Sequence, residues 1–174
     1  LRNVCGLTGH KAEVWDNGIR SPLLVRWPGK IKPGIRKHVT MVEDILPTLI
    51  DMAKIPSNKQ PKHLPFTGKS FRASLENRRF TEDRDIFRLA LAGPGEPGPT
   101  TATGIIEDAA ETDYNRLHTV LRNGDYKLHH LPGGNYRLYD MKKDPGEKKD
   151  LSQKMPERTA QMAKRCRARW DEIV

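Results

Sequence analysis

Between residues 85 and 140 short apolar runs alternate with turn residues, and this pattern constrains the fold more than any other feature of the chain. Asn123-Gly124 is the strongest short hairpin signal, because an Asn-Gly pair tolerates the positive φ angles of a tight turn and apolar runs flank it on both sides. The stretch "LPGGN" (131–135) predicts a second reversal, and "DIFRLALAG" (85–93) has the pattern of a strand. We therefore predict an antiparallel meander of three or four strands.

The last twenty residues, "MPERTAQMAKRCRARWDEIV", have the pattern of an amphipathic helix. Met162, Cys166 and Trp170 recur at four-residue spacing, which places them on one face. This helix is predicted to close the small sheet.

The first part of the chain has a different character. In "SPLLVRWPG" (21–29) a continuous apolar run between two prolines predicts a short buried strand of the kind found in parallel or mixed sheets. A helix is predicted next, with Thr40 as the N-cap, Glu43 completing a capping box, and an end near Ala53 before Pro56. The chain is therefore of the α/β class up to about residue 75, and an antiparallel sheet with a closing helix follows.

Composition limits how much of this can form a self-contained core. Hydrophobic residues make up 36% of the chain and charged residues 30%, so we expect some apolar faces to need a partner that is not in this sequence. The formal charge of +9 attracts polyanions, and a sulfated or otherwise acidic substrate would benefit from it. The basic residues are spread along the chain and aromatic residues are few, so we do not expect nucleic-acid binding.

Three further features concern the context of the chain. No stretch approaches the 18 or so apolar residues that a membrane span needs, so we expect no membrane partner. The two cysteines, Cys5 and Cys166, cannot define a disulfide framework. The chain begins with Leu1 and no signal region follows, so we expect it to be part of a longer protein.

Three stretches of the sequence resemble the sulfatase family. The first is "GHKAEVWDNGIRSPLLVRWPGKIKPG" (9–34), in which a glycine-flanked lysine precedes an acidic-x-Gly-Ile-Arg run and a strand that ends in Trp-Pro-Gly. The second, "VEDILPTLIDMAKI" (42–55), is similar to the helix that follows. The third, "VLRNGDYKLHHLPGGNYRLYDMKKDPGEKKDLS" (120–152), resembles the C-terminal subdomain. The order matches that of the family over nearly the whole chain, which corresponds to the C-terminal portion only.

The resemblance implies an alkaline-phosphatase-like α/β fold. Residues 1–75 would be the C-terminal end of the large α/β domain, and residues 76–174 the C-terminal subdomain with its antiparallel sheet and closing helix. It also implies that a complete family member hydrolyses sulfate monoesters with a formylglycine nucleophile and calcium. The nucleophile motif, Cys/Ser-x-Pro/Ala-x-Arg, is absent, since neither cysteine nor any serine has the required neighbours. We therefore expect no catalytic residue and no metal or cofactor site in this chain, which is expected to be inactive alone.

Lys11 is the one candidate site residue. It matches the family lysine that contacts the sulfate, and an ammonium is a compact point charge suited to a sulfate oxygen. The neighbouring His10 is expected to be a structural or surface residue.

Several other polar groups resemble sites without the right context. Asp16-Asn17-Gly18 is expected to form a turn, not a calcium site, and Arg20 is expected to pair with a carboxylate. His129 and His130 are adjacent in a strand, so their side chains should point to opposite faces. The acidic residues Asp140, Asp144 and Glu147 are expected to build a turn.

Three functions remain open from the sequence. The first is a segment of a sulfatase whose partners are a sulfated small molecule or glycan and the missing N-terminal part of the same protein. The second is a non-catalytic module that binds polyanions, and the third is a relative that acts on phosphate or phosphonate esters, since one fold hosts several chemistries. The family resemblance implies a periplasmic or extracellular location. The loops at 57–70 and 93–113 carry no ligand signature that would identify the ester.

Overall fold

The chain divides into two compact units in a computed structural model that describes residues 6–11, 13–60, 67–81, 84–90 and 113–173. One unit combines Leu1–Pro22 with Asp83–Val174, and the other is Leu23–Glu82. The first 22 residues thus belong with the sheet, although the sequence division fell at residue 75. The assignment of residues 1–75 to the large α/β domain of a complete enzyme, and of residues 76–174 to its C-terminal subdomain, stays a prediction.

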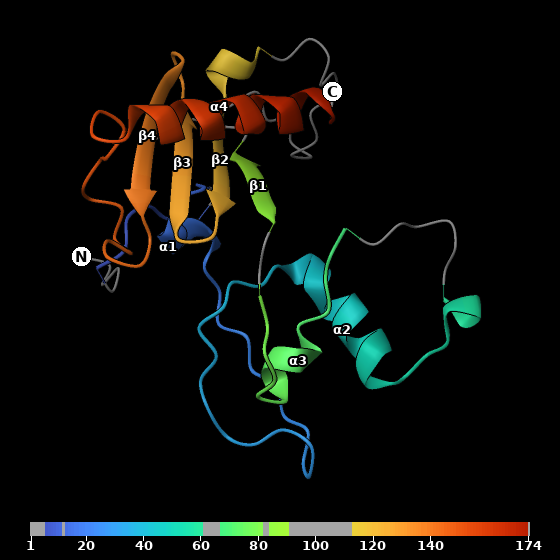
Figure 1. Ribbon diagram of the computed structural model, residues 1–174. Helices are drawn as coiled ribbons and strands as arrows, with labels where there is room; N and C mark the ends of the chain where they lie inside the picture. The colour runs from blue at the N-terminus through green and yellow to red at the C-terminus, as the bar shows by residue number, and fades with distance from the viewer. Residues whose placement is uncertain (1–5, 12, 61–66, 82–83, 91–112, 174) are drawn as a thin grey trace. The chain divides into compact units, whose positions relative to one another are not determined.

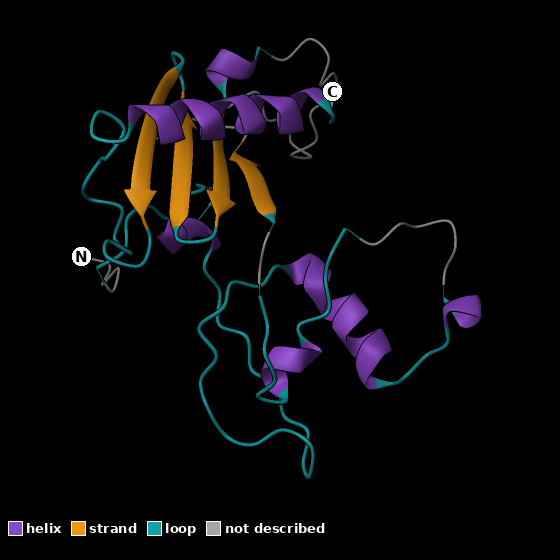
Figure 2. Cartoon of the chain, in the orientation of Figure 1, coloured by secondary structure: helices purple, strands orange, loops and turns teal. Residues whose placement is uncertain are grey.

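The first unit is built on a four-stranded antiparallel sheet (Figures 1 and 2). Each strand pairs with the next along the chain, so the sheet is the predicted meander. Its strands are β1 (Asp85–Ala90), β2 (His118–Asn123), β3 (Tyr126–Leu131) and β4 (Asn135–Asp140).

The hairpin between β2 and β3 turns one residue later than the Asn-Gly signal indicates. Asn123 pairs with Tyr126, so the two loop residues are Gly124 and Asp125, and Gly124 has a φ of 55°. Asn123 stays in the sheet because it also pairs with Asp85 of β1, whose carboxylate accepts a hydrogen bond from the Asn123 side-chain amide at 3.1 Å. The reversal after β3 lies where it was predicted, between Leu131 and Asn135.

Helix α4 (Pro156–Asp171) covers one face of the sheet, as Figure 1 shows. Proline opens the helix at a position where its missing N–H is not needed. The predicted stripe of Met162, Cys166 and Trp170 is buried. The predicted closing helix is therefore confirmed. Met162 and Cys166 pack with Leu121, Leu128 and Leu138.

The opposite face of the sheet carries the N-terminal segment. Side chains alternate along a strand, so the neighbours of the α4-facing leucines point away from α4. Val14 packs against Val120 and Ala90, and Trp15 packs against Tyr139 and Met141. The single turn of α1 (Asp16–Ile19) follows, on the side of the sheet away from α4 in Figure 1.

The second unit contains short helices around one buried carboxylate. Asp44 is 1% exposed and accepts hydrogen bonds from the backbone N–H groups of Met41 and Lys69, both at 2.8 Å. The predicted capping box of Thr40 and Glu43 is therefore wrong, because the carboxylate one residue after Glu43 makes the capping bond. The elements are η1 (Val42–Asp44), α2 (Ile45–Met52), η2 (Ser57–Lys59) and α3 (Arg72–Leu75).

The predicted buried strand at 21–29 does not form. These residues have no strand assignment, and Leu24 is 89% exposed. A strand needs a neighbour that accepts its backbone hydrogen bonds, and no described residue offers one to this segment. The apolar run is only partly covered in the described structure, since Leu23 is 47% and Val25 37% exposed.

Apolar side chains of η1 and α2 are also left exposed. Val42 is 74% exposed, and Leu46 and Leu49 are each about half exposed. Thr48, on the other side of α2, is buried and receives a hydrogen bond from the N–H of Phe71 at 3.1 Å. The second unit therefore combines polar contacts with a few buried apolar side chains, Phe71 and Leu75 among them, while much of its apolar surface stays uncovered. The helices of the described structure are all too short or too polar to cross a membrane.

The difference in burial between two leucines gives the first prediction. We expect Leu128→Ala to lower the free energy of unfolding of the sheet unit by about 2–5 kcal/mol, because Leu128 is fully buried beneath α4. The matched change Leu24→Ala should alter it by less than about 0.5 kcal/mol, because that side chain is in solvent. Denaturant unfolding followed by far-UV circular dichroism measures both, and equal effects would contradict the packing described.

Candidate functional site

Lys11 lies on a short turn whose backbone is closed by its neighbours. The N–H of Glu13 donates to the carbonyl of His10 at 3.1 Å, and the N–H of His10 donates to a Glu13 carboxylate oxygen at 2.9 Å. The His10 ring adds a hydrogen bond from Nδ1 to the Lys11 carbonyl at 2.8 Å. The Lys11 side chain is exposed, and no described residue pairs with its ammonium. His10 thus holds its own turn together, which agrees with the structural or surface role expected for it.

Two glycines let this turn fold back on the segment that follows. A Cβ at Gly18 would lie 2.2 Å from the Glu13 carbonyl oxygen and 2.5 Å from that of His10. Gly9 has a φ of 91°, and a Cβ there would lie 2.4 Å from the Cβ of Trp15. Side chains at these two positions would therefore displace the turn that carries Lys11.

The segment around Lys11 is tied to the turn that follows β4. The Thr8 hydroxyl donates to the carbonyl of Gly146 at 2.5 Å, and the N–H of Asp16 donates to Glu147 Oε2 at 2.7 Å. These bonds join residues more than 130 positions apart in sequence. They fix both ends of the Lys11 segment to one sheet.

A buried ion cluster lies beneath this segment. The Lys127 ammonium on β3 is 3.0 Å from Asp16 Oδ1 and 2.7 Å from Glu147 Oε1, and the side chains of Lys127, Asp16 and Glu147 are 1%, 8% and 0% exposed. Charges so far from water are stable only when each has a close partner of opposite sign. The cluster therefore forces the N-terminal segment and the turn after β4 to meet at β3.

Two histidines extend the cluster, and their hydrogen bonds define their protons. His129 Nε2 is 2.7 Å from Glu147 Oε1, which can only accept, so Nε2 carries the proton. His129 Nδ1 then accepts from His118 Nε2 at 2.9 Å, and His118 Nδ1, which has no partner in the described structure, carries no proton. Both rings are neutral in this arrangement. Burial lowers the pKa of His118 from 6.5 to about 3, and burial together with the charge of Lys127 lowers that of His129 well below its usual value.

Trp15 covers the cluster from the side of the N-terminal segment. Its ring stacks on His129 with the centroids 4.1 Å apart and meets Tyr139 edge-on at 5.9 Å. Trp15 is 7% exposed, so it shields the ion pairs from water and strengthens their attraction. Lys11 lies four residues before this anchor.

The structure also shows the contacts of the polar groups that the sequence analysis did not assign to a site. Asp16-Asn17-Gly18 forms the helical turn α1, with Asp16 committed to Lys127 and the Asn17 amide donating to the Gly9 carbonyl at 2.7 Å. The Asp16 carboxylate and the Asn17 amide nitrogen are thus engaged within the protein, which does not fit a calcium cage. Arg20 lies 3.9 Å from Asp16, so it has a carboxylate partner as predicted, although its side chain is 61% exposed and enters no strand.

His129 and His130 point to opposite faces of the sheet, as predicted. His130 stacks on Tyr114 with the ring centroids 4.0 Å apart, whereas His129 joins the ion cluster on the other face. Cys166 is buried, and burial raises the pKa of its thiol, which is the opposite of what a nucleophile needs. Cys5 lies outside the described residues. In the described ranges no three His, Cys, Asp or Glu side chains are grouped so that they could hold a metal ion.

The acidic group after β4 divides into two roles. Asp140 and Asp144 accept backbone N–H groups and build the turn, as predicted. Glu147 does not fit that prediction, because it is buried in the ion cluster with a φ of 54°. A signal for the cluster was present in the sequence, since Lys127 stands between Tyr126 and Leu128 inside a strand pattern where a buried lysine needs a carboxylate.

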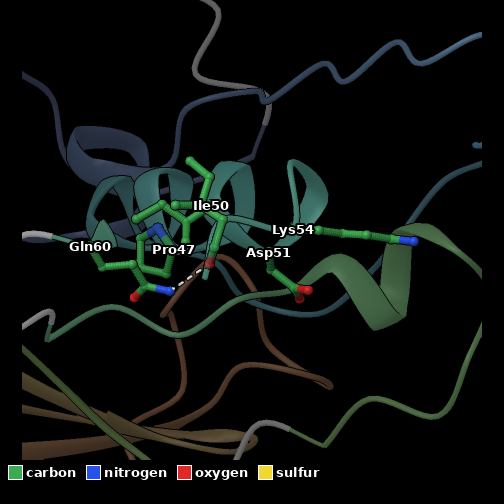
Figure 3. A pocket seen from close by; sticks show the side chains of 6 residues that line it. Pro47, Ile50, Asp51, Lys54 and Gln60 are labelled. Atoms are coloured by element: carbon green, nitrogen blue, oxygen red, sulfur yellow. Dashed lines mark hydrogen bonds between the residues drawn. The ribbon is translucent and has the colours of Figure 1, made fainter. Parts of the chain in front are cut away.

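Figure 3 shows a shallow pocket on the second unit, lined by Pro47, Ile50 and Asp51 of α2 together with Lys54, Ile55 and Gln60. The side-chain amide of Gln60 donates to the Ile55 carbonyl at 2.9 Å, the bond dashed in the figure. The Asp51 carboxylate accepts from Ser70 at 2.7 Å and from Arg72 at 3.1 Å, which lowers its pKa. The carboxylate in the pocket is therefore engaged in holding α2 to the segment around α3.

Comparison with known proteins gives matches over most of the chain. Human arylsulfatase A is 30% identical over 151 residues, which covers 81% of this chain and 28% of that protein. Human steryl-sulfatase is 28% identical over 157 residues, covering 83% of this chain and 26% of that protein. The chain spans about a quarter of the length of these curated relatives. No protein-family model matches it.

A solved structure shares the fold. It comes from work on the metabolism of multiple glycosaminoglycans by Bacteroides thetaiotaomicron and matches with a TM-score of 0.68 at 20% identity, over 96% of this chain and 32% of the other. The match confirms the predicted fold class, an α/β chain that forms the C-terminal part of an alkaline-phosphatase-like fold with a small antiparallel sheet and a closing helix.

Removal of the Lys127 ammonium, at the centre of the ion cluster, should strongly destabilise the fold. We expect Lys127→Met to lower the free energy of unfolding by about 3–5 kcal/mol, because it leaves Asp16 and Glu147 buried without a counter-charge. Arg169→Met is the matched control: it breaks an exposed ion pair with Glu172 and should change the value by less than about 1 kcal/mol. Denaturant titration of both variants is the measurement, and a small effect at Lys127 would contradict the cluster.

The neutral histidines predict a pH dependence. Their pKa values are lower in the folded chain than in the unfolded chain, so the unfolded chain binds protons first as the pH falls below 6.5. Stability should therefore decrease from pH 6.5 towards the folded-state value of about 3 for His118, by about 1.4 kcal/mol per pH unit for each histidine. Unfolding titrations between pH 7.5 and about 5 test this. His118→Gln should reduce the slope, and a stability that stays level or rises would exclude neutral buried rings.

Proposed function

The chain belongs to the sulfatase family, and on that basis we propose that it forms the C-terminal part of an enzyme that hydrolyses sulfate esters, with Lys11 as a contact to the sulfate. The substrate class is a sulfated small molecule or glycan. The proposal concerns a complete enzyme, since this chain spans about a quarter of its curated relatives.

One observation carries the proposal: two of the family-like stretches, 9–34 and 120–152, meet at a single cluster. Asp16 comes from the "WDNGIR" stretch, Lys127 from "GDYKL" and Glu147 from "DPGE", and the three charges are buried in contact. Among the described residues of the sheet unit, this cluster fixes the segment that carries the Lys11 turn. A solvated surface lysine would need no such support.

The chemistry of Lys11 suits the proposed role. A sulfate ester presents oxygens that carry partial negative charge, and charge develops on the leaving oxygen as the ester bond breaks. An ammonium held on a rigid turn can donate hydrogen bonds to these oxygens without reorganisation. Lys11 would thus bind and orient the anion and stabilise its departing oxygen.

The described residues supply neither a nucleophile nor a calcium cage, so this segment would contribute anion binding alone. The formylglycine and calcium that the family resemblance implies would be held by other residues of a complete enzyme. We propose that those residues also cover the open apolar surface of the second unit, where Leu24 is 89% exposed, Ile35 88% and Val42 74%. A periplasmic or extracellular location is proposed on the family resemblance.

A complete sulfatase that contains this segment would test the role of Lys11. We expect Lys11→Ala to lower kcat/KM for an aryl sulfate by about 10²–10³-fold, the usual loss when one donor to a developing negative charge is removed. The matched variant Lys30→Ala, which removes an exposed lysine from the second unit, should leave kcat/KM unchanged.

Two outcomes would count against this proposal. Wild-type activity in Lys11→Ala would reject the proposed contact between Lys11 and the sulfate. The unaltered enzyme can also be given an aryl phosphate and the matching aryl sulfate. Faster turnover of the phosphate would reject sulfate ester hydrolysis in favour of phosphate or phosphonate ester hydrolysis.

A further inference from the structure

Four exposed lysines gather on the turn that follows β4, although the sequence contains no long basic block. We call residues 140–149 the lysine turn; its basic residues are Lys142, Lys143, Lys148 and Lys149. They form two adjacent pairs, and each pair has its backbone held by one aspartate. The fold thereby concentrates positive charge that looks dispersed in the sequence.

The first pair is held by Asp140. Its Oδ1 accepts the backbone N–H groups of Lys142 and Lys143 at 3.1 and 3.0 Å. The Lys143 ammonium lies 3.8 Å from the other carboxylate oxygen, and its side chain is 84% exposed. The carboxylate is thus used mainly to fix the backbone, and the ammonium groups remain available to a ligand.

The second pair repeats this arrangement. Asp144 Oδ2 accepts the backbone N–H groups of Lys148 and Lys149 at 2.8 and 2.7 Å. Glu147, the other acid of the turn, is buried and contacts Lys127, so it does not offset the surface charge. The exposed surface of the turn is therefore positive, and its backbone geometry is fixed by four hydrogen bonds to carboxylates.

The lysine turn adjoins the segment that carries Lys11. The Gly146 carbonyl receives the Thr8 hydroxyl, and the Glu147 carboxylate receives the N–H of Asp16. A Cβ at Gly146 would lie 2.7 Å from the Gly6 carbonyl oxygen, so the two backbones are in direct contact. An extended anion bound at one of these places would reach the other within the same unit.

We propose that the lysine turn is a second anion-binding surface, which holds further sulfate groups of a polymeric sulfated glycan beside the ester bound at Lys11. This inference rests on the proposed function and adds the substrate class: a polymer with several sulfates, in place of a small monosulfate. The turn would act by raising the affinity for long substrates, because each ammonium adds a favourable contact that a single sulfate ester lacks.

The chemistry of the turn favours a sulfated glycan over a nucleic acid. Single-stranded nucleic acids are held largely by bases that stack on aromatic rings, and residues 140–149 contain no aromatic side chain. The lysine ammonium is a compact charge that suits separate tetrahedral anions. Spaced pairs of lysines match sulfates that recur along a sugar chain.

Binding of a heparin-derived oligosaccharide tests the proposal, measured by titration calorimetry on the full 174-residue chain at low ionic strength. The variant replaces Lys142, Lys143, Lys148 and Lys149 by Gln, which removes the charges and keeps the backbone donors. The control variant replaces Lys30, Lys32, Lys54 and Lys59, four exposed lysines of the second unit, and so removes the same charge. Circular dichroism verifies that both variants keep the fold of the parent chain.

We expect the turn variant to bind the oligosaccharide at least about tenfold more weakly and the control variant to lose less than about twofold. The chemically desulfated oligosaccharide should not bind the parent chain. Equal losses in the two variants would overturn the proposal in favour of non-specific attraction by net charge. An oligonucleotide of equal charge that binds the turn as tightly would overturn the assignment to a sulfated glycan.

Oligosaccharide binding to this chain and turnover by a complete sulfatase, measured separately, distinguish this inference from the proposed function. Lys11→Ala should retain most of the oligosaccharide affinity, because the turn supplies most of the contacts. Loss of turnover in Lys11→Ala with no effect of the turn variant on oligosaccharide binding would reject the second surface alone. A turn-dependent affinity in a protein whose Lys11 proves dispensable would reject the sulfate contact alone.

Discussion

The buried ammonium of Lys127 is the constraint on which the rest of the sheet unit depends. A lysine that is 1% exposed on a central strand requires carboxylates within bonding distance, and the chain supplies them from residue 16 and residue 147. Neither carboxylate comes from the strands of the sheet, so the ion cluster recruits two segments that would otherwise be loops. The N-terminal segment, the Trp15 anchor and the turn after β4 all owe their positions to this one charge.

The alternation of side chains along the strands divides the sheet into an apolar face and a polar face. Leu121, Leu128 and Leu138 meet α4 and form an apolar core that needs no further support. The residues that alternate with these leucines along the strands face the N-terminal segment. Their side chains include charged groups, imidazoles and aromatic rings. One sheet thus supplies apolar burial on one side and a polar mounting for the Lys11 turn on the other. The second unit differs, because much of its apolar surface is uncovered.

The sequence predicted what depends on local periodicity. The meander and the buried face of α4 follow from alternation and four-residue spacing, and both are confirmed. The strand at 21–29 was wrong because a strand exists only with neighbours, and residues 21–29 by themselves cannot show whether neighbours are present. The ion cluster was missed because Lys127 and Asp16 are 111 positions apart, although a lysine in a buried strand pattern was a visible signal. The role of Lys11 came from family resemblance and stays a prediction.

The long sequence separation within the cluster has a consequence for biosynthesis. Glu147 is translated 131 residues after Asp16, its hydrogen-bond partner, so the Lys11 turn leaves the ribosome well before the residue that anchors it. Until Glu147 has been translated, the segment around Lys11 lacks this anchor, so its aromatic and acidic side chains are open to chaperones and proteases. The anchoring of this segment is therefore a late event in maturation, and a ribosome that stalls before the codon for Glu147 would release a chain whose N-terminal segment is not anchored.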